Sequence, residues 1–219
     1  MWNGNMERVD LIVIGGGPAG YVAAERAGEA GMRAMVVEQG ALGGVCLNCG
    51  CIPSKTLLNS AKRYHHARHS EDFGVVAEGV CFDMARVAVR KGQIVETLRK
   101  GVAGIMKRSK VKVVEGRGRL AGGRRVDVDG ASYEAEHILI ASGSSPARLP
   151  IPGMDRDGVY DSTRMLDIES LPESVTIVGG GVIGCEFACF FASVDVPVTV
   201  IEMLPEICPS VDAEVAKTL

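Results

Sequence analysis

The chain of 219 residues contains one pattern twice, and this repeat restricts its possible folds more than any other feature. Each copy, at residues 10–38 and 174–202, contains an apolar strand, a glycine-rich turn, a helix of small residues and a second apolar strand ending in glutamate. The glutamate follows the first glycine of its turn by 23 residues in both copies. This succession predicts two β-α-β units with parallel sheets, and therefore an α/β fold.

The first glycine turn, GGGPAG at residues 15–20, fits the G-x-G-x-x-G pattern of dinucleotide-binding turns. Gly15 permits the tight turn, Gly17 leaves room for a pyrophosphate, and Gly20 lets the helix pack closely on the strand. The helix offers N–H groups to the phosphates, and Glu38 can bind a ribose diol. A glycine turn alone is a weak signal, but the strands, helix and acid around this one predict a Rossmann-like dinucleotide site.

The second turn, GGGVIG at residues 179–184, repeats this arrangement through Gly179, Gly181 and Gly184. Glu202 ends the second strand, where a carboxylate accepts hydrogen bonds from a ribose 2′-hydroxyl and repels a 2′-phosphate. Two such units suit two dinucleotides. We therefore predict FAD at the first unit and NAD, rather than NADP, at the second.

Three of the seven cysteines, Cys46, Cys49 and Cys51, cluster in the segment GGVCLNCGCIPSK at residues 43–55. An odd number of cysteines without a secretion signal argues against a structural disulfide framework. Four residues separate Cys46 from Cys51 in a predicted turn entering a helix, so the two thiols can approach closely enough for a disulfide. A helix N-terminus favours thiolates, which would let this pair exchange with a substrate dithiol.

Buried or zinc-binding cysteines are the alternative explanation of this cluster. No second group of cysteines or histidines at zinc-finger spacing completes such a site, so we predict no metal. Three neighbouring histidines fall on a helix that we expect to be exposed: His65, His66 and His69. Cys49, like Cys185 and Cys189 on the second-copy helix, is interpreted as packing.

The segment from Cys46 to Lys55, C-L-N-x-G-C-I-P-S-K, is similar to the redox motif of the dihydrolipoamide dehydrogenases, which belong to the class I pyridine nucleotide-disulfide oxidoreductases. The resemblance covers nearly the whole chain but only the N-terminal half of the family's usual length. It implies that electrons pass from dihydrolipoamide through a Cys46–Cys51 disulfide and FAD to NAD. Cys46 would exchange with substrate sulfur and Cys51 would face the flavin, while Lys55 would lie near the flavin and pair with Glu186.

The same resemblance extends the expected cofactor site beyond the two glycine turns. Gly44 precedes the redox motif, and Gly118 resembles a glycine whose backbone meets the adenine end of FAD. The turn formed by Ser142, Gly143 and Ser144 resembles the family's A-T-G-S turn over the flavin nucleotide, with serine in place of threonine.

The segments between the two repeats predict further elements and a domain boundary. We expect helices at 55–69 and 84–107, a strand at 111–115, a hairpin within 124–140 that turns at Asp129-Gly130, and a buried strand at 138–142. Three prolines and a glycine at 146–153 indicate a linker. The predicted domains are therefore an FAD-binding domain with the redox pair at 1–147 and a partial NAD-binding domain at 148–219.

The resemblance also implies partners and missing parts. The family is homodimeric, and the partner's C-terminal domain supplies a His-Glu acid–base pair, for which this chain has no matching motif. The expected substrate carrier is dihydrolipoamide or a lipoyl domain of a 2-oxo acid dehydrogenase or glycine cleavage complex. The chain is expected to be a truncated form with little lipoamide turnover. The alternatives are another disulfide reductase, such as mercuric or glutathione reductase, and a non-catalytic flavin-binding fragment that needs a second polypeptide.

Charge and hydropathy exclude some other functions. A net charge of −3 gives no reason to expect nucleic acid or an anionic membrane as partner. No apolar run approaches the length of a membrane span, and residues 1–8 lack the plan of a signal peptide, so we expect a cytoplasmic protein. Aromatic residues make up only 5%, which predicts a mainly aliphatic core.

Overall fold

The computed structural model describes residues 6–218, which fall into two compact units. The first unit contains the chain up to Ile52 and Gln93–Arg148, and the second contains Pro53–Gly92 and the chain from Leu149 onward. Residues 1–5 lie outside the described residues; they belong to the segment 1–8, which is expected not to be a signal peptide.

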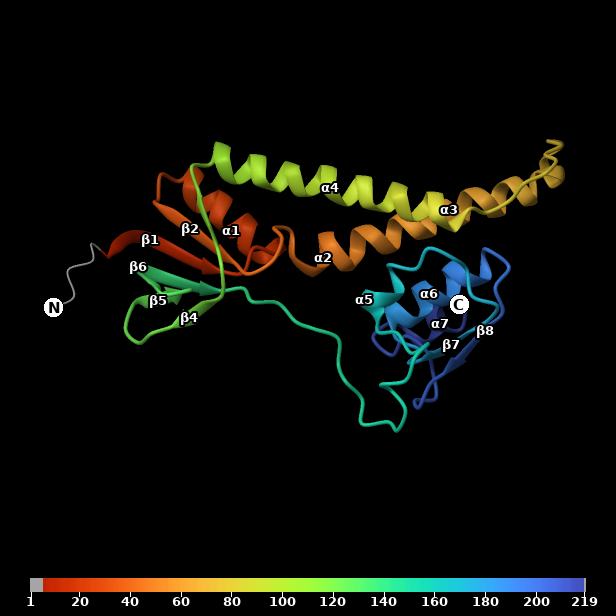
Figure 1. Ribbon diagram of the computed structural model, residues 1–219. Helices are drawn as coiled ribbons and strands as arrows, with labels where there is room; N and C mark the ends of the chain where they lie inside the picture. Colours follow the sequence, from red (N-terminus) through yellow and green to blue (C-terminus); the bar gives the residue numbers. More distant parts are fainter. Residues whose placement is uncertain (1–5, 219) are drawn as a thin grey trace. The chain divides into compact units, whose positions relative to one another are not determined.

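The first unit is built on one mixed six-stranded sheet in the order β3-β2-β1-β6-β5-β4 (Figure 1). The four strands β3, β2, β1 and β6 are parallel, and β5 and β4 continue the sheet antiparallel. Its strands are β1 (Glu7–Ile14), β2 (Ala34–Glu38), β3 (Lys112–Glu115), β4 (Gly118–Leu120), β5 (Arg125–Val128) and β6 (Ala131–Ile140). The predicted parallel sheet and hairpin are both present, so the α/β fold is confirmed.

Alternate side chains of β1 and β2 pack on opposite faces of this sheet. Val13 and Val36 pack with Ala24 and Ala27 of α1 (Pro18–Glu29), which runs along one face. Ile12, Met35 and Val37 pack on the other face against the valines of β5. The small side chains of α1 therefore let the helix approach the strands on which the glycine turn depends.

The last residues of β6 are more exposed than the sequence predicted. The expected buried strand at 138–142 ends at Ile140, which is 61% exposed, and Leu139 is 37% exposed. The register explains this, because β5 pairs only with Ala131–Glu134 of β6. Beyond that point β1 is the one strand paired with β6 in the described part of the chain.

Two long helices, α3 (Cys51–Arg68) and α4 (Met84–Arg108), each contribute residues to both units. They confirm the helices predicted at 55–69 and 84–107 with small differences in their ends. The assignment of residues 1–147 to an FAD-binding domain and of residues 148–219 to an NAD-binding domain stays a prediction. Residues 53–92 group with the second unit, although the sequence assignment gave them to the first domain.

The second unit contains the second β-α-β repeat. Strands β7 and β8 pair in parallel, and α6 connects them. Phe190 and Phe191 of α6 are almost fully buried against Leu57 and Ala61 of α3, so aromatic side chains form much of this core. The elements are β7 (Val175–Val178), α6 (Val182–Ala192), β8 (Val198–Ile201), α5 (Ser162–Met165), α7 (Ala213–Ala216) and the 3-10 helix η1 (Ser70–Phe73).

Among the described residues, none of the helices is long and apolar enough to cross a membrane.

Candidate redox and nucleotide-binding site

The first glycine turn has the backbone geometry that its sequence predicts. Gly15 has φ +108°, a left-handed conformation that side chains rarely adopt. A Cβ on Gly20 would lie 1.8 Å from the carbonyl oxygen of Gly15, so any larger residue would force α1 away from β1. The turn ends at Gly17, the N-cap of α1, and the first N–H groups of the helix therefore have no partner within it.

Glu38 lies beside this turn with its carboxylate held by backbone donors. The N–H of Gly16 donates to Oε2 at 2.6 Å, and the N–H of Gly40 donates to Oε1 at 2.8 Å. These bonds fix the carboxylate at the end of β2, while each oxygen keeps a second lone pair for a hydroxyl donor. The arrangement fits a dinucleotide with phosphates at α1 and a ribose at Glu38.

The segment before the cysteines is attached directly to the same turn. The N–H of Gly43 donates to the carbonyl oxygen of Gly16 at 2.8 Å. Gly44 has φ +59°, and a Cβ there would lie 2.6 Å from the Cα of Gly17. Only glycine allows this approach, so the sequence brings the cysteine segment against the nucleotide turn through backbone contact alone.

The cysteine motif is more helical than predicted. The structure has a short helix, α2 (Gly44–Cys49), where the sequence predicted a turn, and the break comes at Gly50. Cys46 is half-buried in α2, and Cys51 is the exposed first residue of α3. The two cysteines lie near each other, and Cys49, also half-buried, lies between them in the chain.

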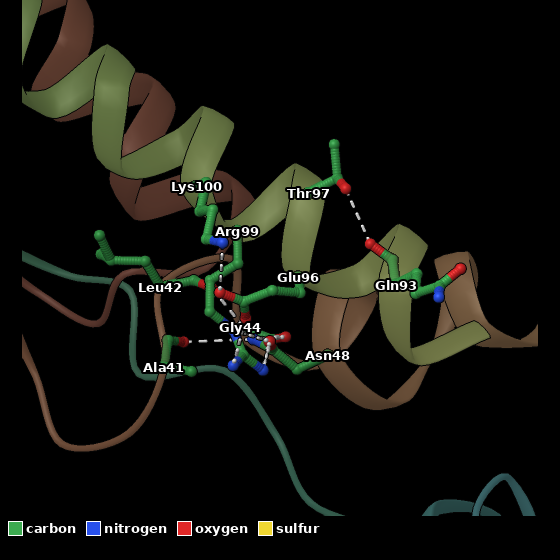
Figure 2. Close-up of polar contacts among 9 residues, drawn as sticks. All are labelled: Ala41, Leu42, Gly44, Asn48, Gln93, Glu96, Thr97, Arg99 and Lys100. Atoms are coloured by element: carbon green, nitrogen blue, oxygen red, sulfur yellow. Dashed lines mark hydrogen bonds and ion pairs between the residues drawn. The ribbon is translucent and has the colours of Figure 1, made fainter. Parts of the chain in front are cut away.

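Asn48, which the sequence analysis did not single out, holds this segment together. Its amide nitrogen lies 3.2, 3.1 and 2.9 Å from the carbonyl oxygens of Ala41, Leu42 and Gly44 (Figure 2). Its Oδ1 accepts two hydrogen bonds from Arg99 of α4, at 3.1 Å from Nε and 2.8 Å from Nη2. The side chain therefore ties the loop before the cysteines, α2 and α4 into one network.

Apolar packing supports the same contact between α2 and α4. Leu47 of α2 is buried with Val95 and Val102 of α4. Because residues 95, 99 and 102 share one face of a helix, the apolar contact and the Asn48–Arg99 bonds reinforce each other. The short helix that carries Cys46 is thus fixed on both sides of that cysteine.

Lys55 and Glu186 lie within the second unit and form an ion pair, as the resemblance implied. Their side chains are 58% and 27% exposed, respectively. Partial exposure makes the pair a weak contributor to stability. The roles of both residues toward a flavin stay predictions.

The second glycine turn reproduces the first. Gly179 has φ +109°, and a Cβ on Gly184 would lie 2.1 Å from the carbonyl oxygen of Gly179. The N–H of Gly180 donates to Oε2 of Glu202 at 2.6 Å, and the N–H of Leu204 donates to Oε1 at 2.7 Å. The bonds from Leu204 and Gly180 lower the pKa of Glu202, so the acid is held as a carboxylate. A Cβ on Gly181 would meet nothing within 4 Å, which leaves space for phosphates beside α6.

The remaining predicted cofactor residues differ in their surroundings. The turn containing Ser142, Gly143 and Ser144 follows β6 and starts beside Gly15, where a Cβ would lie 2.2 Å from the oxygen of Ala141. Gly118 opens β4, and a Cβ there would meet apolar side chains at 3.3–3.5 Å: Ile14, Val37 and Val126. The packing of the sheet is therefore tight at this glycine, and its predicted contact with the adenine end of FAD stays a prediction.

The interpretation of Cys189 as core packing was wrong, because its side chain is exposed on α6. Cys185 is half-buried, and its thiol has a polar partner, the thiol of Cys208. Among residues 6–218, no group of three or more His, Cys, Asp or Glu side chains is arranged to hold a metal ion.

Comparison with known proteins identifies the class to which this geometry belongs. The sequence model of the pyridine nucleotide-disulphide oxidoreductases matches residues 9–219. The chain belongs to this family. In this family member, the hydrogen bond from Gly43 to Gly16 joins the cysteine motif to the first glycine turn.

The relatives within this family include several dihydrolipoyl dehydrogenases. The enzyme of Acholeplasma laidlawii is 42% identical over 219 residues, covering 96% of this chain and 65% of the relative. That of Bacillus subtilis is 40% identical over 213 residues, covering 94% of this chain and 46% of the relative. The chain therefore spans only about half to two thirds of the length of these curated relatives.

A solved structure with the same fold is the HOCl-induced flavoprotein disulfide reductase RclA of Escherichia coli, in its Cu(II) complex. It superposes with a TM-score of 0.83 at 31% sequence identity, covering 97% of this chain and 46% of RclA.

Proposed function

We propose that this chain acts as a flavoprotein disulfide oxidoreductase of the dihydrolipoyl dehydrogenase type, with Cys46 and Cys51 as its redox pair. Its electron donor would be dihydrolipoamide, free or on the lipoyl domain of a 2-oxo acid dehydrogenase or glycine cleavage complex, and its acceptor NAD. The identities of 40–42% to dihydrolipoyl dehydrogenases support this substrate class.

The hydrogen bond from Gly43 to Gly16 is the observation that carries the proposal. It joins the segment that leads into Cys46 to the turn whose carboxylate, Glu38, fits a ribose. If FAD bound this turn with its adenosine ribose at Glu38, its flavin end would therefore lie in the region of the thiols. Such proximity is what electron transfer between a thiol pair and a flavin requires.

The thiol chemistry follows from the two cysteines. A substrate thiolate attacks the Cys46 sulfur of the Cys46–Cys51 disulfide and releases Cys51 as a thiolate. The second substrate thiolate then attacks the substrate sulfur bound to Cys46, which closes the substrate disulfide and releases the Cys46 thiolate. FAD, when bound, supplies the two-electron transfer from these thiolates to NAD.

Glu202 supports NAD rather than NADP as acceptor. Its carboxylate is fixed at the end of the second repeat and kept ionised by backbone donors. An ionised carboxylate there accepts bonds from the 2′-hydroxyl of NAD and repels the 2′-phosphate of NADP.

A spectroscopic titration tests the proposal on the chain as it exists. Purified protein loaded with FAD is reduced by dithionite without oxygen and then reoxidised by NAD or NADP, with thiols counted at each stage. We expect reduction to expose two additional thiols and NAD to reoxidise the flavin faster than NADP. Absence of flavin binding, or an unchanged thiol count, would contradict the proposal.

Serine variants assign the thiols that appear. Cys46→Ser and Cys51→Ser should each abolish the gain of two thiols while the protein still binds FAD. Cys81→Ser is the matched control, because Cys81 is also exposed but lies outside the motif. If the control changed the count as much as Cys51→Ser, the assignment of the redox pair would be wrong.

Reduction of a disulfide other than lipoamide is a second candidate function. The similarity to the E. coli flavoprotein disulfide reductase, at a TM-score of 0.83, favours it. Turnover of NADH with lipoamide, glutathione disulfide and mercuric ion as alternative acceptors distinguishes these classes. Preference for lipoamide supports the first candidate.

A further inference from the structure

Two cysteines outside the redox motif meet at the second glycine turn. The Sγ of Cys208 lies 3.5 Å from the Sγ of Cys185, and both residues belong to the second unit. Cys185 follows Gly184 in α6, and Cys208 lies in the loop after β8. A disulfide needs a sulfur–sulfur distance of about 2 Å, so closure requires an approach of only about 1.5 Å.

Both cysteines also form hydrogen bonds with Gly180, the second of the three consecutive glycines in that turn. The N–H of Cys208 donates to the carbonyl oxygen of Gly180 at 2.7 Å, and the thiol of Cys185 lies 3.3 Å from the same oxygen. Because the N–H of Gly180 is bonded to Glu202, the thiol pair and the predicted ribose-binding acid share one residue.

The first repeat shows that this position does not require a cysteine. There the equivalent bond to Gly16 comes from Gly43, a glycine with φ +101°. Cys208 adopts a similar left-handed conformation, with φ +48°, although a side chain makes it costly. The second repeat thus carries a cysteine where glycine serves the first, opposite a second cysteine.

We propose that Cys185 and Cys208 form a second, regulatory dithiol site that hydrogen peroxide converts into a disulfide. One thiol loses its proton, and the thiolate attacks the peroxide to give a sulfenic acid and hydroxide, which takes up that proton as water. The other thiol then attacks the sulfenic sulfur and displaces hydroxide, which leaves as a second water with the proton of this thiol, giving the disulfide. The two cysteines lose two electrons and two protons in total, and the peroxide is reduced to two waters. Peroxide suits the site because it is small, while Cys208 is only 4% exposed and Cys185 is half-buried, which hinders the approach of bulky disulfide oxidants.

The disulfide would fix the loop after β8 to the start of α6. This loop carries Leu204, whose N–H holds the carboxylate of Glu202, while Met203 is 94% exposed. Oxidation therefore locks the backbone that positions the acid at the second nucleotide turn. The proposal concerns these thiols alone and does not depend on the redox role of Cys46 and Cys51.

The surroundings predict slow oxidation at neutral pH. Burial, followed by the hydrogen bond to Cys208, raises the pKa of Cys185 to about 11, and the charges of Cys208, Cys189 and Glu202 act in the same direction. At pH values below the pKa, the reactive thiolate fraction rises about tenfold for each unit by which the pH increases. Oxidation started by Cys185 should therefore accelerate about tenfold per unit between pH 7 and 10.

Peptide mapping tests the proposal on the complete chain. Folded protein is treated with hydrogen peroxide, blocked with maleimide and digested without reductant. We expect a peptide pair joined through Cys185 and Cys208, with a loss of about 2 Da relative to the two thiol peptides. Absence of this pair at about pH 10, where the Cys185 thiolate is appreciably populated, and at peroxide concentrations that oxidise the exposed Cys189, would overturn the proposal.

Two variants and an unfolded sample control the result. Cys208→Gly removes the sulfur and suits the left-handed backbone, so it should fold at least as well and lose the linked peptides. Cys189→Ser, one helical turn from Cys185, should retain them. Linkage of Cys185 to Cys208 that formed only in urea would mean that the folded site does not bring the sulfurs together, and would overturn the proposal.

Discussion

Asn48 and Arg99 are 51 residues apart in the chain, yet the guanidinium of Arg99 donates both an Nε and an Nη2 hydrogen bond to the single Oδ1 of Asn48 (Figure 2). This leaves the amide NH₂ of Asn48 directed at three carbonyl groups of the loop and helix before it. The amide oxygen of Asn48 faces the guanidinium, and the amide nitrogen faces the carbonyl groups. A single orientation of the Asn48 amide therefore makes all of these polar contacts favourable.

The first prediction concerns this network. Asn48→Ala should lower the free energy of unfolding by about 2–3 kcal/mol, because it removes the side-chain bonds to three carbonyls and to the guanidinium of Arg99 in a half-buried place. Urea unfolding of the reduced protein measures the change. Thr97→Ala is the control on the neighbouring face of α4, where Thr97 bonds only the carbonyl of Gln93 in its own helix. If both variants lost equal stability, Asn48 would not be holding the segment.

The second prediction concerns Asp195, which the sequence analysis did not include in the site. It has φ +63°, and its Oδ2 accepts a hydrogen bond from Tyr64 at 2.8 Å. Asp195→Ala loses this bond and keeps the strained conformation, so it should cost about 1–2 kcal/mol. Asp195→Gly loses the bond but adopts the positive φ without strain, and should cost less.

Thermal unfolding of the Asp195 variants measures this order, with Asp195→Asn closest to the wild-type protein. The first repeat offers a matched site, because Gly31 has φ +83° and open space around its Cβ position. Gly31→Ala should therefore measure only the free-energy cost of placing a side chain on a residue with a positive φ. An Asp195→Gly variant less stable than Asp195→Ala would contradict the argument.

The third prediction separates stability from chemistry at the Lys55–Glu186 pair. Both side chains are partly exposed, so a double-mutant cycle with Lys55→Gln and Glu186→Gln should give a coupling energy below about 1 kcal/mol. If Lys55 contributes to the flavin site, the affinity for FAD should fall in Lys55→Gln while urea unfolding stays nearly unchanged. A coupling of several kcal/mol with unaltered FAD affinity would make the pair structural.

The sequence predicted the two turns well because their geometry is local. Glycine at 15, 20, 179 and 184 is required by backbone conformation or by close contact, and these demands are visible in the spacing of the residues. The bond between Gly43 and Gly16 was not predicted, although the glycine pair before the motif was the signal that could have indicated it.

Contacts that depend on how helices and strands meet could not be predicted in the same way. The Asn48–Arg99 and Cys185–Cys208 pairs depend on the rotation of a helix about its axis relative to another segment, which hydrophobic spacing does not fix for polar residues. The exposure of Ile140 depends on where β5 stops pairing with β6. An apolar run alone cannot show whether a second strand lies beside it.

The final prediction uses the ionisation of Glu202. Backbone bonds from Leu204 and Gly180 lower its pKa in the folded protein below the ordinary value of 4.5. The ionised carboxylate therefore stabilises the fold above that pH, and this contribution disappears as the pH falls through the lower folded pKa. Glu202→Gln should remove this part of the acid destabilisation, so its stability should vary less between pH 5 and 3.

Urea unfolding of the reduced protein at a series of pH values measures this difference. Some acid sensitivity should remain in Glu202→Gln, because the hydrogen bonds from Arg33 also lower the pKa of Asp10. Glu206→Gln, an exposed change in the same loop, should keep the wild-type pH dependence. If the free energy of unfolding became equally less dependent on pH in both variants, the effect would come from the net charge of the loop. If it changed only in Glu202→Gln, the effect would come from the two N–H groups that hold this carboxylate at the second glycine turn.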